Sequence, residues 1–586
     1  MTALRRRLAV TLAGVTVAAA ALAGCSGDDD AAPKTTAGER STRAGGTLTT
    51  LSLGPVLTWD PQRIATRDDM AFAVRIFART LTAYAPGTSA DEQSRLVGDL
   101  ATDTGTPNDD FTQWRFTLRE GAKWQDGTSV TCADLAYGIS RTFATAVISG
   151  GSTDALAVLD VPRGLDGSST YRGPYDTSKA NAAGQQAFSK AVSCTGSTIT
   201  FHLSAPTADF NEMLTLPAFS PIKKAKDKGK DGTYAVFSAG PYTLEGDWKP
   251  AHGGTWVRNP HWEAKSDPVR SAYPDRIDFR EGVQPQSVAQ SVIEDRDSGA
   301  TSVALTSAPP SLHQELTGIL ALKDRTLNPA TGVVDYLVPN VSRAPMKNEH
   351  VRVALATATN RLAYVTALGG PSTGDPTFSV LASALPAAHT DDPVGAGLRG
   401  DPVAARAILT KAKVSLPVKI TVAYRSSEAA TKAMAGLVAG WREAGFAPTL
   451  RPIADNYFTA ISDPALKSQV DVFWSNWSAA WASASTVLPP LFDSSINLTA
   501  AGPGRDYGWY ADDLMNSRMS KISRIADRAE REQAWSAVDI ALLQQGIYIG
   551  LSERRGLYVA GSGVRNLAGN EVLGGVVELA DIAVAP

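Results

Sequence analysis

Few residues of this sequence have the types and spacing that catalytic or cofactor chemistry requires. Residues 395–400 carry glycines at the G-x-G-x-x-G spacing, which binds a pyrophosphate where a strand meets a helix. Asp391, Asp392 and Pro393 precede these glycines, and such residues do not form the required strand. The six histidines lack metal-ligand spacing: His202, His252, His261, His313, His350 and His389. We therefore predict no cofactor, no metal site and no catalytic residue.

The N-terminus has the three zones of a secretory signal. Arginines at positions 5–7 form a positive region, residues 8–22 are uncharged and mostly apolar, and Cys25 follows small residues. The apolar run is short for a transmembrane span, which needs about 20 residues. Residues 22–25 resemble the lipobox of bacterial lipoproteins. This resemblance implies a signal peptide over residues 1–24 and a diacylglycerol on Cys25, with an ordinary cleaved signal as the alternative.

The mature chain is predicted to begin with a tether and to continue as a multidomain protein. Residues 25–45 are rich in Ser, Gly, Asp, Thr and Ala without an apolar cluster, which predicts a disordered segment. The remaining residues exceed the size of one core, so we expect two or three domains. Loss of the three signal arginines changes the net charge from -3 to -6. A mildly acidic chain without a basic stripe argues against a nucleic-acid partner.

Cys132 and Cys194 are the other two cysteines. An even pair in an oxidising compartment predicts a disulfide bond. Two buried free thiols are the alternative.

The pattern along the chain is mixed α/β. Residues 112–119 alternate apolar and polar side chains, which predicts a half-buried strand. Thr131 followed three residues later by Asp134 predicts a capped helix that runs to about residue 143. Residues 158–190 contain few large apolar side chains and predict a long surface loop. In the second half, strands at 418–422 and 446–453 enclose a helix from Ser427 to Gly445, and this predicts a βαβ unit with parallel strands.

Several segments of the chain carry recognisable sequence motifs. Residues 114–134 form the longest one, and it ends in a turn at Asp126 and Gly127 and a helix cap. Shorter patterns follow at residues 240–242, 258–260, 351–361 and 401–409. Together they resemble the extracytoplasmic solute-binding proteins of ABC importers, family 5, which includes dipeptide-, oligopeptide- and nickel-binding proteins. The resemblance covers essentially all of residues 46–580.

This resemblance implies an α/β, two-lobed, periplasmic-binding-protein-like type II fold with an extra inserted subdomain in the first lobe. Two crossings of the chain join the lobes, and the clamp closes on its ligand by hinge rotation. The implied boundaries are 46–90, 235–283 and 505–586 for lobe I, 91–234 for its inserted subdomain and 284–504 for lobe II.

The resemblance also indicates where a ligand binds. In peptide-binding relatives, a W-x-x-D segment of the second lobe supplies an aspartate that pairs with the α-ammonium of the peptide. Here Trp477 matches the tryptophan and Ala480 occupies the aspartate position. Asn476 and Trp481 belong to the same stretch, and indoles that line a cleft offer flat walls for stacking. If the stretch is helical, Trp474, Trp477 and Trp481 share one face, and packing in the core is the alternative.

In the first lobe, Arg67, Asp68 and Asp69 occur where relatives approach the ligand backbone. Arg67 has the charge to pair with a carboxylate, and Asp68 or Asp69 can replace the missing acid. A solvated charged loop is the alternative.

We therefore predict an extracytoplasmic monomer, lipid-anchored to the cell membrane, that captures a peptide or peptide-like solute between its lobes. It delivers the solute to the permease of an ABC importer and is not an enzyme. Three alternatives stay open. The protein can be a lipoprotein sensor of peptides without import, or a binder of a sugar or metal chelate. The least favoured alternative is a surface hydrolase that uses some of its many carboxylates.

Overall fold

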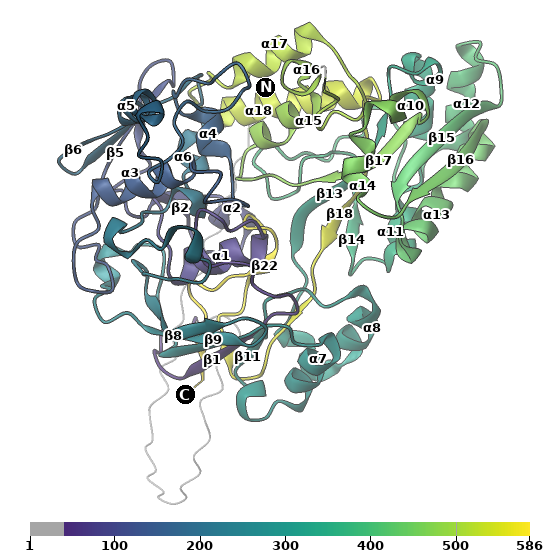
Figure 1. Ribbon diagram of the computed structural model, residues 1–586. Helices are drawn as coiled ribbons and strands as arrows, with labels where there is room; N and C mark the ends of the chain where they lie inside the picture. Colours follow the sequence, from purple (N-terminus) through teal and green to yellow (C-terminus); the bar gives the residue numbers. More distant parts are fainter. Residues whose placement is uncertain (1–39, 500, 586) are drawn as a thin grey trace, which may run out of the picture. The chain divides into compact units, whose positions relative to one another are not determined.

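A computed structural model describes residues 40–499 and 501–585 (Figure 1). Cys25, the predicted signal peptide over 1–24 and the tether up to residue 39 lie outside the described residues. Within the described part of the chain, no helix is both long enough and apolar enough to cross a membrane.

The first lobe contains a five-stranded sheet in the order β11-β1-β10-β9-β8. β1 runs parallel to both β10 and β11, and β9 runs antiparallel to β10. Helix α1 (Arg67–Ile76) packs on this sheet, and the rings of its Phe72 and of Phe279 on β10 have centroids 5.0 Å apart. The strands are β1 (Thr47–Leu51), β8 (Tyr242–Lys249), β9 (Gly253–Arg258), β10 (Arg276–Arg280) and β11 (Ser302–Ala304).

The segment predicted as the inserted subdomain contains an antiparallel sheet in the order β4-β5-β7-β6. On β5, Trp114 and Phe116 are buried while Arg115 and Thr117 are exposed, as the alternation predicted. The strands are β4 (Thr106–Pro107), β5 (Gln113–Thr117), β6 (Val192–Thr195) and β7 (Thr198–His202).

Helix α3 (Cys132–Arg141) begins at the predicted capping box. The Thr131 hydroxyl accepts a hydrogen bond from the Asp134 backbone N–H, and the Asp134 carboxylate accepts one from the Thr131 N–H at 2.9 Å. Cys132 at the start of this helix forms a disulfide bond with Cys194 on β6. The predicted disulfide is therefore confirmed, and it joins the helix to the edge of the subdomain sheet.

Residues 158–190 do not form only a surface loop. They include most of α5 (Ala182–Ala191), and Tyr171 and Phe188 lie buried with stacked rings whose centroids are 4.8 Å apart. Most of the few large apolar side chains of this segment gather in one core cluster, while Leu165 is exposed.

The second lobe is organised around a six-stranded sheet in the order β14-β18-β13-β17-β15-β16. β15 and β16 are parallel and flank α13 (Glu428–Ala444), which confirms the predicted βαβ unit. The Ser427 hydroxyl caps this helix, and Gly445 ends it at a φ of 106°. The strands are β13 (Ala330–Pro339), β14 (Gly374–Pro376), β15 (Val418–Arg425), β16 (Phe446–Ile453), β17 (Val472–Trp477) and β18 (Ile549–Arg555).

The sheets divide the chain differently from the predicted lobe boundaries at 284 and 505. β11 completes the first sheet, although its residues were predicted to belong to lobe II. β18 pairs with β13 in the second sheet, and α18 (Arg528–Gln544) packs in a buried cluster with β13. Both β18 and α18 were predicted to belong to lobe I. Periodicity identifies a strand but not its partner, because the paired residues are far apart in sequence.

The chain thus crosses from the first sheet to the second just before β13 and returns just after β18. Short strands accompany the two crossings: β12 (Thr326–Leu327) pairs antiparallel with β19 (Tyr558–Val559). The two connections between the lobes therefore run side by side (Figure 1).

Candidate ligand-binding site

A cavity of about 750 Å³ has walls from both lobes. The first lobe contributes α1, Tyr84 and residues 215–217, and the second contributes β17, the loop up to Ala480 and Arg505. Much of the wall is apolar, formed by Met70, Val74, Leu216, Phe458, Leu491, Val572 and Leu573. Pockets of about 300–1,000 Å³ hold small ligands in other proteins, so the space suits a small solute that touches both lobes.

One face of α1 lines the cavity. Arg67, Met70, Ala71 and Val74 all lie on the wall, at the spacing of successive helical turns. Thr66 caps the helix by accepting a hydrogen bond from the Asp69 backbone N–H. The helix therefore presents its apolar stripe and one guanidinium to the ligand space.

Asp68 and Asp69 lie off this face and are not among the residues that line the cavity. The Thr66 hydroxyl donates a 2.5 Å hydrogen bond to the Asp69 carboxylate. Burial raises the pKa of both carboxyls to about 6, because a charged carboxylate loses hydration there. The structure thus places Arg67, but neither aspartate, at the cavity wall.

The tryptophans that were predicted to line the cleft lie in different environments on strand β17 and after it. The stretch is a strand that continues into a loop, so these tryptophans do not share a helical face. Trp474 is buried in the core of the second lobe, and its Nε1 donates a 3.0 Å hydrogen bond to the Tyr364 hydroxyl. Trp477 and Asn476 line the cavity. The Trp477 Nε1 donates a 2.8 Å hydrogen bond to the Thr486 carbonyl, which fixes the indole.

The loop after β17 carries Ala480 and Trp481 to different environments. Ala480 is exposed and lines the cavity, where it offers neither charge nor a side-chain hydrogen bond. Trp481 is buried against the core of the segment predicted as the inserted subdomain and does not line this cavity. The next residue, Ala482, donates its backbone N–H to the Tyr84 hydroxyl at 2.7 Å. This loop therefore holds the lobes together beside the ligand space.

Two arginines that the sequence analysis missed complete the wall. Arg554 follows the middle of β18, and its Nη2 lies 2.8 Å from Oδ1 of the buried Asp335 on β13. The Arg505 guanidinium lies 4.4 Å from the centroid of the Trp477 ring. Arg505 belongs to a Gly- and Pro-rich loop without periodicity, so no local signal in the sequence pointed to it.

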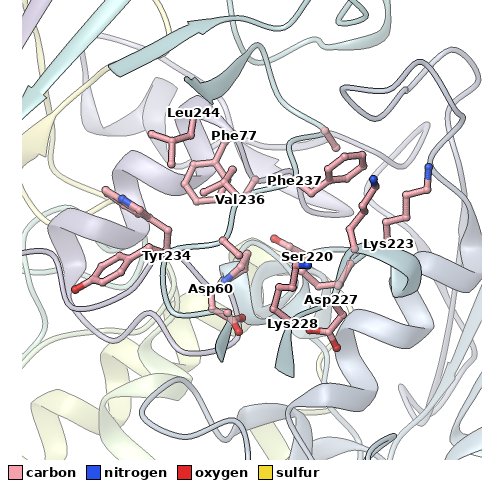
Figure 2. A pocket seen from close by; sticks show the side chains of 18 of the residues that line it. Asp60, Phe77, Ser220, Lys223, Asp227, Lys228, Tyr234, Val236, Phe237 and Leu244 are labelled. Atoms are coloured by element: carbon pink, nitrogen blue, oxygen red, sulfur yellow. The ribbon is translucent and has the colours of Figure 1, made fainter. Parts of the chain in front are cut away.

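A second cavity, of about 260 Å³, lies within the first lobe (Figure 2). Its walls include the side chains of Phe77, Val236 and Phe237 and the carboxylates of Asp60 and Asp227. All its lining residues fall between positions 59 and 247, so a ligand there would contact one lobe only. The larger cavity is therefore the candidate site of a two-lobed clamp.

Comparison with known proteins decides the family. Residues 95–498 match the model of the bacterial extracellular solute-binding proteins, family 5 Middle. The chain belongs to this family. The predicted family is thus confirmed, and family 5 consists of binding proteins rather than enzymes.

Relatives of this family 5 protein cover most of its length. The periplasmic murein peptide-binding protein MppA of Escherichia coli (strain K12) is 25% identical over 383 residues, which are 60% of this chain and 62% of MppA. The alignment thus spans less than two thirds of that relative. The structure of clavulanic acid biosynthesis oligopeptide binding protein 2 superposes with a TM-score of 0.81 and 25% identity, covering 93% of this chain and 97% of the other.

A more distant structure shows the same architecture. DppA from Helicobacter pylori in complex with the peptide STSA gives a TM-score of 0.61 at 16% identity, covering 93% of this chain and 99% of DppA. These superpositions confirm the mixed α/β, two-lobed periplasmic-binding-protein fold.

Proposed function

We propose that this family 5 protein captures a peptide or peptide-like solute in the cavity between its lobes and delivers it to the permease of an ABC importer. The observation that carries the proposal is the 750 Å³ cavity, whose walls come from both lobes. The names of three similar proteins support the ligand class, since they describe a murein peptide-binding protein, an oligopeptide-binding protein and a peptide complex.

The connection between the lobes suits a closing motion. The two crossings meet at the β12–β19 pair, so a small change in backbone angles there rotates one lobe against the other. A ligand that contacts both walls binds the closed form better than the open form and shifts the population toward closure. The permease then recognises the closed, loaded protein.

The proposal includes an extracytoplasmic location at the membrane. The lipobox-like residues before Cys25 support cleavage there and attachment of diacylglycerol. Two acyl chains anchor a protein much more firmly than one. Such a tether keeps the captured solute near the permease.

Ligand screening tests the proposal. Native mass spectrometry of the purified protein identifies any solute carried through purification. Thermal denaturation with pooled di- to pentapeptides should then raise the melting temperature, because a ligand that binds only the native state stabilises it by mass action. If sugars or metal chelates stabilise the protein and peptides do not, the peptide assignment is wrong. Peptide binding without uptake by cells would favour a sensor over an importer.

A further inference from the structure

The charged groups of the interlobe cavity are unevenly distributed. Three arginines line it, Arg67, Arg505 and Arg554, against one carboxylate, Asp154. Asp154 already accepts a hydrogen bond from the Ser152 hydroxyl. The nature of the ligand depends on which of these charges are free to bind it.

Arg554 is not free, because its charge is balanced within the protein. Its Nη2 lies 2.8 Å from Oδ1 of Asp335, and its Nε donates a 3.0 Å hydrogen bond to the same oxygen. The Asp335 side chain is 2% exposed, so this carboxylate depends on Arg554 as its counter-ion. This pair positions a wall of the site.

Arg67 and Arg505 have no such partner. Among the described residues, neither forms an ion pair. Arg67 donates from Nη1 to the Thr331 carbonyl at 2.5 Å, a bond to a neutral group. Asp68 follows it in sequence but lies off the lining face of α1. The Arg505 side chain stacks on Trp477 and donates to no described residue, which leaves its planar fork of N–H groups available.

The two guanidinium groups that lack an ion-pair partner belong to opposite walls. Arg67 begins α1 in the first lobe, whereas Arg505 lies beside β17 through its contact with Trp477. The guanidinium group of arginine can bind a carboxylate through two parallel hydrogen bonds. These charged hydrogen bonds are stronger than those from a neutral donor. When the cleft closes and water leaves, an unpaired guanidinium loses hydration, so a ligand anion is needed to compensate. Burial lowers the pKa of Arg67, and the charge of the neighbouring Asp68 only partly opposes this shift.

The cavity walls also offer few groups that could bind a ligand cation. Ala480 lines the cavity and offers no side-chain acceptor for an ammonium group. Asp154 is the one lining acid, and it is already hydrogen-bonded. Recognition of a ligand cation would therefore rely on this one carboxylate, against three arginines.

We infer that the ligand is an anionic solute with at least two carboxylates, one bound by Arg67 and the other by Arg505. The inference rests on the proposed function, since it concerns the same cavity, and it narrows the ligand class to acidic peptides and related polycarboxylates. Arg505 and Arg67 are the residues that determine this specificity. Because they lie on opposite walls, one dianionic ligand bridges the lobes and favours closure.

Paired ligands test the inference by isothermal titration calorimetry. The first probe is a pool of tripeptides with Asp or Glu at two positions and a free C-terminus, and the second is the matched Asn/Gln pool with a C-terminal amide. We expect the acidic pool to bind at least about tenfold more tightly than the neutral pool. Equal affinity for the two pools would overturn the inference and leave the proposed function standing.

Variants separate the role of the arginines from general charge effects. Arg505→Gln and Arg67→Gln should each weaken binding of acidic ligands about tenfold or more and change neutral binding less than about twofold. Arg518→Gln removes an exposed arginine of α17 (Asp513–Ile522) that does not line the cavity, so it should leave both unchanged. Unchanged acidic binding in both cavity variants would also contradict the inference.

Simple polycarboxylates such as glutarate and citrate are tested as ligands in the same way. If they stabilise the wild-type protein but not Arg505→Gln, while no peptide binds, then the inference holds and the peptide assignment fails. If neither peptides nor polycarboxylates bind the folded protein, both the inference and the peptide assignment fail.

Discussion

The Trp481 indole Nε1 donates a 2.8 Å hydrogen bond to Oδ2 of Asp209, which joins the loop after β17 to the segment predicted as the inserted subdomain. Both side chains are buried, and the Ser485 hydroxyl donates to the same carboxylate oxygen. Trp481 therefore holds two lobes together. It was a candidate ligand residue in the sequence, with packing in the core as the alternative.

Trp481→Phe should loosen this contact. Phenylalanine keeps most of the apolar packing but removes the donor to a buried carboxylate, which costs about 1.5–3 kcal/mol for a charged acceptor. Denaturant unfolding should show lower stability, and small-angle X-ray scattering of the unliganded protein should show a larger radius of gyration. Trp474→Phe is the control, because that indole bonds to Tyr364 within the second lobe. It should lower stability without a change in scattering.

The coupling between Trp481 and Asp209 can be measured directly. A double-mutant cycle with Trp481→Phe and Asp209→Asn should give an interaction energy of about 1–2 kcal/mol, since the two groups contact each other. Strictly additive effects of the two substitutions would contradict a direct hydrogen bond.

Loss of the Cys132–Cys194 disulfide should destabilise the protein while leaving ligand affinity intact. The bond closes a loop with a sequence separation of 62, and removal of native disulfides typically costs about 2–5 kcal/mol. Differential scanning calorimetry of the Cys132→Ala/Cys194→Ala protein measures the loss. Neither cysteine lines the interlobe cavity, so the dissociation constant of any bound peptide should stay within about twofold. A large loss of affinity would instead link the subdomain to the binding site.

Glu212 should make stability depend on pH. The pKa of this carboxyl is raised to about 7, chiefly by burial and also by the nearby carboxylates of Asp209 and Glu532, while Arg528 and the Tyr84 hydroxyl oppose the shift. The folded protein therefore keeps a proton that the unfolded chain loses near pH 4.5. The contribution of Glu212 to the free energy of unfolding should therefore fall as pH rises from about 4.5 to about 7 and then level off.

Glu212→Gln carries a permanently neutral side chain and should remove this dependence. It should match the wild type near pH 4.5 and exceed its stability by about 1–3 kcal/mol at pH 8, as urea unfolding at each pH will show. Glu530→Gln alters an exposed carboxylate of α18 and should keep the wild-type pH profile. Parallel profiles for Glu212→Gln and the wild type would exclude Glu212 as the source.

Ala480→Asp should introduce a preference for a ligand ammonium group. Ala480 is exposed at the cavity wall, so a carboxylate fits there without burial. We expect affinity for a peptide with a free α-ammonium to rise about three- to tenfold relative to its N-acetyl form, measured by calorimetry. Ala480→Asn, which has the same shape without the charge, should change this ratio little. An equal gain in both variants would indicate a steric effect.

Cys25→Ser should release the protein from the membrane. Without the thiol no diacylglycerol is attached, so cell fractionation should find the variant in the soluble extracytoplasmic fraction, and its intact mass should lack two acyl chains. Its ligand affinity should not change, because the cavity is lined by residues between Ala65 and Leu573. The Cys132→Ala/Cys194→Ala protein should stay at the membrane. If Cys25→Ser also stays there, the anchor is not a lipid on Cys25.

Local features of the fold could be predicted from the sequence because neighbouring residues determine them. The capping box at Thr131 and Asp134 begins α3, and Ser427 and Gly445 delimit α13, since these contacts span only a few positions. The alternation on β5 and the family pattern around it likewise follow from short-range residue types. They were sufficient to predict the family, the α/β class and the disulfide.

Tertiary structure alone decided which distant segments meet. β11 joins the first sheet and β18 the second through hydrogen bonds to partners up to hundreds of residues away, and these bonds leave no periodic signal in the chain. The same holds in the site. Trp481 looks in sequence like a second cleft indole, yet its loop buries it against Asp209, and Arg505 becomes a ligand-facing group only because its loop folds over Trp477. Sequence thus determined the elements and the family, whereas long-range packing determined the lobe boundaries and the charge of the cavity.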